Sequence, residues 1–258
     1  MNIDLYEMAY RNYKYSEIRK PDTNISISEK TKKSVMNTLE ILKHTKEKIE
    51  NAIQFSDVFC NVIPVFDEKT HNLSYRNDYM FIDGKKDDPN EIVKRFKKLD
   101  INTLPLIEVA KYLSIKVEKS NILKANGIFN STENKITLGS DYPPIFIHEL
   151  AHAIHHIFLE SSGLSEYDEI FGGLDDFKDI QEYFYSFFEL VAELSTVVLC
   201  RTYNISINVP HALCYLNNYS RLNINAKALF AKALFADVLR ICEYVNKCVE
   251  KIEEKRRL

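Results

Sequence analysis

The sequence predicts an α+β fold, mostly helical, in which a small sheet packs on one central helix. Long stretches repeat apolar residues at helical spacing, as Val35, Leu39 and Leu42 do. Short apolar stretches with strand character gather between residues 115 and 138. Only 6 of the 258 residues are glycine, which favours helices over tight turns. The chain is 45% hydrophobic and 28% charged, which is the composition of an ordinary globular protein.

The expected elements fall into two blocks: residues 1–100, a helical and mixed N-terminal region of unclear role, and residues 101–258, the domain that carries the chemistry. Apolar periodicity predicts helices at 28–54, 104–113, 180–203 and 226–254, and one that begins after Asp141 and runs to about residue 158. Strands are expected at 58–66, 79–82, 115–118, 127–130 and 135–138. Ser140 and Asp141 can cap the helix that follows them, and Pro143 and Pro144 fit its first turn, where backbone N–H groups have no partner within the helix.

Charge and hydropathy exclude several classes of protein. The net charge is −3, from 34 basic and 37 acidic residues, so a strongly basic nucleic-acid binder is not indicated. No apolar stretch reaches the roughly 18 residues of a membrane span, and the N-terminus lacks the apolar core of a secretory signal. Five cysteines without CxxC spacing favour reduced, buried thiols. A cytoplasmic protein with no membrane partner is therefore expected.

The main candidate site is the segment HELAH at residues 148–152. On a helix, His148 and His152 project from one face, one turn apart, where two imidazoles can bind the same metal ion. Glu149 stands beside them as a general base for a metal-activated water. A catalytic zinc site needs three protein ligands and one open position. The segment therefore predicts one catalytic Zn²⁺, although manganese and iron also accept such ligands.

The third ligand is expected on a later helix. The metzincin pattern would need glycine at 155 and histidine at 158, where this chain has His155 and Phe158. Glu189 and Glu193 instead share one face of the helix at 180–203, surrounded by apolar residues. We expect Glu189 to bind the metal and Glu193 to accept a hydrogen bond from a ligand histidine.

These segments resemble the gluzincin-type metallopeptidase domain of ArdC-type antirestriction proteins. The likeness covers about residues 104–250, and the segments that carry it are 127–130 (GIFN), 134–138 (NKITL), 148–152 (HELAH), 188–194 (FELVAEL), 199–200 (LC), 211–216 (HALCYL) and 228–230 (ALF). It implies a zincin-like fold and a zinc-dependent hydrolase of peptide or protein substrates, of a kind borne on mobile elements. A more distant likeness is to the ImmA/IrrE metallopeptidases, which share the helix–strand–strand–HExxH layout.

Two alternative functions follow from these resemblances. One is an antirestriction or single-stranded-DNA-binding protein whose metal site is structural or secondary. The single-stranded-DNA-binding domain of ArdC proteins is not recognisable in residues 1–100, but a local basic and aromatic cluster occurs there. It consists of Tyr10, Arg11, Tyr13, Lys14, Tyr15, Arg19 and Lys20. The other alternative is a regulatory protease that cleaves one specific repressor.

Peptide hydrolysis also needs a donor for the developing oxyanion and a surface for the substrate. Four residues are candidates for the donor: Tyr183, Tyr185, His211 and Tyr215. The ArdC resemblance places a histidine at 211, and Tyr185 lies one helical turn before Glu189. The strand formed by Lys135, Ile136, Thr137 and Leu138 is expected to be the sheet edge on which an extended peptide pairs. His155 and His156 lie one turn beyond His152; His156 could extend the metal-binding face, but surface or supporting roles are expected. The sequence carries no sign of an oligomeric state.

Overall fold

The structure is a computed structural model. It describes residues 25–53, 62–67, 72–77, 81–82, 85–86, 96–120, 126–162, 177–209, 212–213, 215–216 and 227–258. Of these, the strands between 62 and 86 and residues 46–53, 160–162, 177–183 and 227–233 are described by their backbone alone. Cys60, His211, Cys214 and the basic and aromatic cluster at 10–20 lie outside the described residues.

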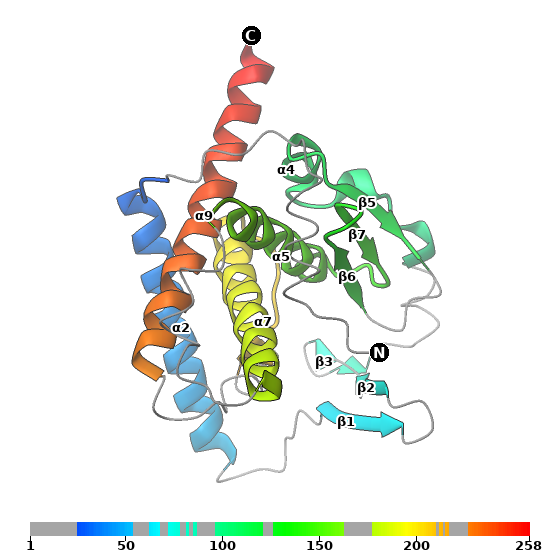
Figure 1. The fold of residues 1–258 in the computed structure, drawn as a ribbon, viewed down its shortest axis with the longest axis vertical. Helices are drawn as coiled ribbons and strands as arrows, with labels where there is room; N and C mark the ends of the chain where they lie inside the picture. The colour runs from blue at the N-terminus through cyan, green and yellow to red at the C-terminus, as the bar shows by residue number, and fades with distance from the viewer. Residues whose placement is uncertain are drawn as a thin grey trace.

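Four long helices form most of the described chain (Figure 1). They are α2 (Glu29–Ile53), α5 (Pro143–Ser162), α7 (Phe177–Thr202) and α9 (Lys227–Arg257). Helix α7 lies between α5 and α9 and packs against both, and α2 packs against α7 and α9. Each of the four overlaps a helix predicted from apolar periodicity. Helix α5 begins at Pro143, and the Ser140 hydroxyl accepts a hydrogen bond from the Tyr142 N–H just before it.

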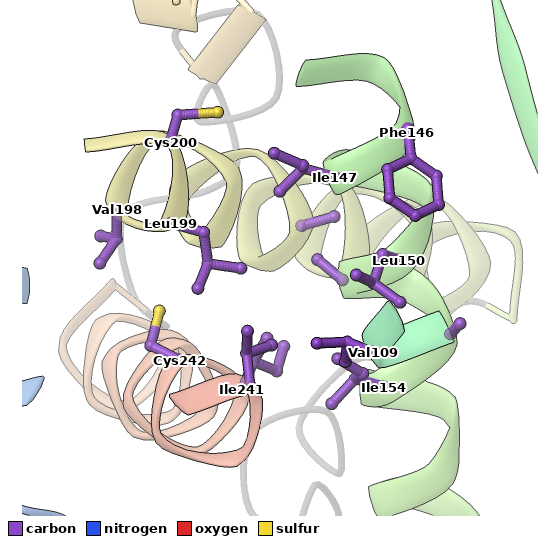
Figure 2. Packing of buried hydrophobic residues seen from close by; sticks show 14 of the residues in the cluster. Val109, Phe146, Ile147, Leu150, Ile154, Val198, Leu199, Cys200, Ile241 and Cys242 are labelled. Atoms are coloured by element: carbon purple, nitrogen blue, oxygen red, sulfur yellow. The ribbon is translucent and has the colours of Figure 1, made fainter. Parts of the chain in front are cut away.

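The core lies where α5, α7 and α9 meet. Figure 2 shows Leu150 and Ile154 of α5 with Ile241 of α9, close to Leu199 of α7. All four side chains are fully buried. Burying each such side chain contributes roughly 1.5–3 kcal/mol. The core therefore fixes the relative positions of α5 and α7, the two helices that carry the predicted metal ligands.

A three-stranded sheet packs on α5 (Figure 1). Its strands are β5 (Lys116–Lys119), β6 (Gly127–Asn130) and β7 (Lys135–Leu138), in the order β5-β7-β6. Strand β7 runs parallel to β5 and antiparallel to β6. The bounds of β6 and β7 are those predicted. The α+β class is confirmed, since this small sheet accompanies a mostly helical chain.

The predicted substrate edge is wrong. Strand β7, Lys135 to Leu138, is the central strand, with Ile136 paired to both Val117 of β5 and Phe129 of β6. Its backbone groups are therefore already used by its two neighbours. Among the described residues, β6 is the edge strand that packs against α5. Strand order in a sheet depends on the path of the connections, which periodicity does not report.

The predicted helix at 104–113 is shorter than expected. It forms as α4 (Ile107–Tyr112), preceded by the 3₁₀ helix η1 (Ile101–Thr103). Two further strand pairs lie earlier in the chain: β1 (Val62–Asp67) with β2 (Asn72–Asn77), and β3 (Phe81–Ile82) with β4 (Lys85–Lys86), both antiparallel. Strands at 58–66 and 79–82 were expected, but β2 and β4 were not.

A network of side-chain hydrogen bonds links the start of α2 to α9. Glu243 is buried and accepts hydrogen bonds from the Ser28 hydroxyl at 2.7 Å and the Thr31 hydroxyl at 2.5 Å. Asn246 donates to the same Thr31 oxygen at 3.0 Å and accepts from the Tyr203 hydroxyl at 2.7 Å. The start of α2 is thus anchored on α9. Among the described residues, no helix is long and apolar enough to cross a membrane.

Candidate metal centre

The candidate ligands come from two helices held together by the core. Helix α5 presents His148 and His152 one turn apart, and α7 presents Glu189 and Glu193 one turn apart. Since α5 packs directly against α7, the two pairs face each other. Leu150 of α5 and Val191 of α7 are buried in the core. Their burial fixes the rotation of each helix about its own axis and so the direction in which its polar residues project.

His148, His152 and Glu189 form a compact group. The Nε2 atoms of His148 and His152 are 3.0 Å apart. Glu189 places Oε2 3.3 Å from His148 Nε2 and Oε1 3.6 Å from His152 Nε2. One nitrogen or oxygen from each residue lies within 4.8 Å of the others. This is the only group of its kind among the residues that the structure describes.

The spacing of these atoms fits a tetrahedral zinc ion. Zinc lies about 2.0–2.2 Å from nitrogen and oxygen ligands, so two ligands of a tetrahedral site are about 3.3 Å apart. The three observed separations, 3.0, 3.3 and 3.6 Å, bracket that value. Two imidazoles and a carboxylate are also a donor set found in catalytic zinc sites. The side chains present are therefore suited to a divalent cation.

Two further residues hold the ligands in place. Glu193 Oε2 lies 3.0 Å from His148 Nδ1, so that nitrogen can donate to the carboxylate while Nε2 faces the cluster. Such a partner fixes the tautomer and orientation of a ligand imidazole. The Tyr215 hydroxyl donates a hydrogen bond to Glu189 Oε2, and the Tyr215 ring meets the His148 ring edge to face at 5.7 Å. Glu193 and Tyr215 thus each contact a residue of the three-residue group.

The predicted general base, Glu149, is buried between α5 and β6, with 8% of its surface exposed. Burial raises the pKa of its carboxyl group. Electrostatic interactions with His148 and His152 oppose that shift, as does a hydrogen bond from the backbone N–H of Phe129 in β6. The carboxylate of Glu149 is not a member of the three-residue group. Its electrostatic interactions with His148, His152 and Glu189 nevertheless place it close to that group.

The charges of the metal-free cluster explain its large pKa shifts. Burial acts to lower the pKa of His148, but hydrogen bonds to Glu189 and Glu193 outweigh it and raise the pKa to about 10. Burial acts to raise the pKa of Glu189, but His148 and His152 lower it well below its usual range. A proton on His148 thus balances the surrounding carboxylates, and a cation bound in the cluster would take over this role.

The other predicted donors are less well placed or lie beyond the described residues. Tyr185 has 54% of its surface exposed, in contrast to the buried Glu189 one turn later on α7. His211 and the side chain of Tyr183 lie outside the part of the chain that the structure describes. Tyr215, among the candidates whose side chains the structure describes, donates a hydrogen bond from its hydroxyl to Glu189 of the cluster.

Two features near the site were missed by sequence analysis. His155 is buried and bonds through Nε2 to Asp237 Oδ2 of α9 at 3.1 Å, where a surface or supporting role was expected. The open sheet edge next to Glu149 is β6, in which Phe129 packs its ring 5.9 Å from that of His156. An isolated glycine in a strand signals a close approach of another group to the backbone. Gly127 was therefore the one sequence feature that could have indicated the close packing of β6 on α5.

The fold and the site together define an α+β protein with a His/His/Glu group suited to a divalent cation. Comparison of the chain with family models, with curated proteins and with solved structures finds no match.

Proposed function

We propose that this chain is a zinc-dependent metallopeptidase of the zincin-like, gluzincin type. The observation that supports it most is the convergence of His148, His152 and Glu189 from two helices, with Glu149 beside them but outside the group. A structural zinc site closes its coordination with four protein ligands, whereas a catalytic site keeps one position open. Three ligands and an adjacent buried carboxylate are the catalytic arrangement.

In this proposal each residue has one task. His148, His152 and Glu189 would hold the Zn²⁺, which when bound supplies Lewis acidity and makes a water molecule acidic at neutral pH. Glu149 accepts a proton from the attacking water and then passes it to the amine that leaves as the peptide bond breaks. Its raised pKa suits both steps, since a base must also be able to return the proton.

The substrate surface in this proposal is strand β6. The Gly139 N–H bonds to the Asn126 carbonyl at 2.8 Å, next to the pair of Gly127 with Leu138. In an antiparallel pair hydrogen-bonded and non-hydrogen-bonded positions alternate, so the backbone groups of Gly127 and Phe129 point away from β7. The Phe129 N–H bonds to the Glu149 carboxylate, so the Phe129 carbonyl and the backbone groups of Gly127 are the ones offered to an extended peptide beside Glu149.

Tyr215 is the proposed donor to the oxyanion. Its hydroxyl lies at the cluster and bonds to Glu189, one of the three ligands. A hydroxyl that donates to a carboxylate in the free protein can donate to a negatively charged oxygen during the reaction. Tyr215→Phe is expected to lower kcat about 10²–10³-fold, the range for loss of one such donor.

The test combines metal analysis with hydrolysis. Zinc is measured in the purified chain and in the His152→Ala variant, and both are incubated with a pool of quenched fluorogenic peptides. We expect about one zinc per wild-type chain, little in the variant, and cleavage by the wild type alone. Glu149→Gln should keep its zinc and lose roughly 10²–10⁴-fold in rate, the usual contribution of acid–base catalysis. Full activity of Glu149→Gln would exclude the mechanism.

A further inference from the structure

Gly127 occupies the point at which strand β6 comes closest to the proposed general base. A Cβ atom added there would lie 2.8 Å from Glu149 Oε1 and 2.9 Å from Glu149 Cγ. It would also lie 2.8 Å from Ile145 Cγ2. Contacts below 3.0 Å are essentially never made by a real Cβ. The glycine is required for space and not for its backbone angles, because its φ lies outside the left-handed region.

The neighbours of Gly127 decide which group would yield to a larger residue. Ile145 lies in α5, where a β-branched side chain has one strongly preferred rotamer. Moving its Cγ2 therefore costs conformational energy. The backbone of β6 is paired with β7 along its whole length. The group with the most freedom is the Glu149 side chain. An alanine at 127 would therefore push the Glu149 carboxylate away from β6.

The position of Glu149 against β6 also brings it to a hydrogen-bond donor. Phe129 lies two residues after Gly127, so both backbone groups face the same side of the strand, and the Phe129 N–H bonds to the Glu149 carboxylate. Phe129 packs on α5 at His156, whereas Ile128, on the opposite face, is 47% exposed. One face of β6 thus lies along α5, with the bare backbone of Gly127 against Glu149.

We propose that Gly127 is a positioning residue for Glu149: its missing side chain lets strand β6 hold the carboxylate beside the His148, His152 and Glu189 cluster. The inference rests on the proposed function, because it gives Glu149 the role of general base. Strand β6, the proposed substrate surface, would then also determine the position of the Glu149 carboxylate. Larger residues at 127 should impair the chemical step without removing the metal ligands.

The first test needs no substrate. The urea midpoint of the metal-free full-length chain is measured for wild type, Gly127→Ala, Glu149→Ala and the double variant. We expect Gly127→Ala to lower the midpoint in the wild-type background and by clearly less when Glu149 is alanine, because the Cγ and Oε1 atoms it meets are then gone. The control is Gly139→Ala, at the end of β7, whose effect should be the same in both backgrounds. Equal effects of Gly127→Ala in both backgrounds would overturn the proposal.

The second test uses the zinc-loaded chain and the best-cleaved peptide of the fluorogenic pool. Gly127→Ala should keep its zinc and its KM within about twofold and lose about 10²-fold in kcat, the scale of a small misplacement of a catalytic group. An unchanged kcat, or a loss confined to KM, would overturn the positioning role while leaving the peptidase intact. A wild type that cleaves no peptide would instead remove the proposed function, and with it the role given to Gly127.

Discussion

At the scale of single residues, Glu193 illustrates how the cluster depends on side chains that do not belong to it. Its carboxylate lies 3.0 Å from His148 Nδ1, so it keeps the other nitrogen, Nε2, turned toward His152 and Glu189. Without this partner the His148 ring has more freedom and is a weaker base. The residues that hold a ligand are thus part of the affinity of the site.

Glu193→Ala is therefore expected to weaken zinc binding about 10–100-fold, the usual cost of losing such a partner. Glu193→Gln is the matched control, since an amide oxygen can still accept the hydrogen bond although the charge is lost, and its affinity should fall less. Affinity is measured by competition with a chromogenic chelator. Equal affinities of wild type and Glu193→Ala would show that Glu193 does not orient the ligand.

The metal-free protein should depend on pH through His148. Its folded pKa is raised from 6.5 to about 10, so its stabilising contribution is complete below about pH 6.5 and is lost as the pH rises toward 10. The free energy of unfolding, measured by urea titration without metal, should fall over this window. The difference between wild type and His148→Phe isolates the effect from other groups, and an equal slope for both would contradict it.

Zinc binding should have the opposite dependence on pH, because the ion competes with the proton on His148. Glu189 adds nothing to this window, since its pKa is lowered from 4.5 and it is already ionised there.

At the scale of elements, α5 is held from two sides. On one face, His148 and His152 contact Glu189 of α7. On another, His155 forms a buried hydrogen bond with Asp237 of α9. Arg240 Nη1 adds a contact to the other Asp237 oxygen at 3.5 Å. Helix α5 is thus fixed by a polar link to α9, in addition to the apolar core of Figure 2.

Asp237→Ala is expected to lower the free energy of unfolding by about 1–3 kcal/mol, because a buried hydrogen-bonding group loses a partner. Asp237→Asn keeps an acceptor for His155 and should cost less. Both values come from urea denaturation followed by circular dichroism. If Asp237→Ala and Asp237→Asn both kept the wild-type free energy of unfolding, the link between α5 and α9 would contribute nothing to the stability of the fold.

At the scale of the whole molecule, the proposed ligands come from two helices, α5 and α7, that are separated along the chain, so metal binding should stabilise the folded state. Zinc at 100 times its dissociation constant would add about 2.7 kcal/mol to the free energy of unfolding. The melting temperature should therefore rise on addition of zinc and fall back on addition of a chelator. His152→Ala should show little of this shift, and an equal shift in that variant would place the zinc elsewhere.

Much of the local structure followed from the sequence. The bounds of β6 and β7 were predicted, and the segment at 148–152 placed two histidines and a glutamate on one helix, because helical spacing sets which side chains share a face. Glu189 and Glu193 were recognised for the same reason. The choice among Tyr183, Tyr185, His211 and Tyr215 could not be made, since it depends on how the chain after α7 returns to the cluster.

What the sequence by itself determined are the features set within one helical turn or one strand: the paired histidines, the paired glutamates and the glycine in β6. Only the tertiary structure decided that β7 is central and β6 an edge strand of the described sheet, that Tyr215 reaches Glu189, and that His155 is buried against Asp237. Such contacts join residues far apart along the chain. They depend on the packing of whole helices and strands, which no local pattern records.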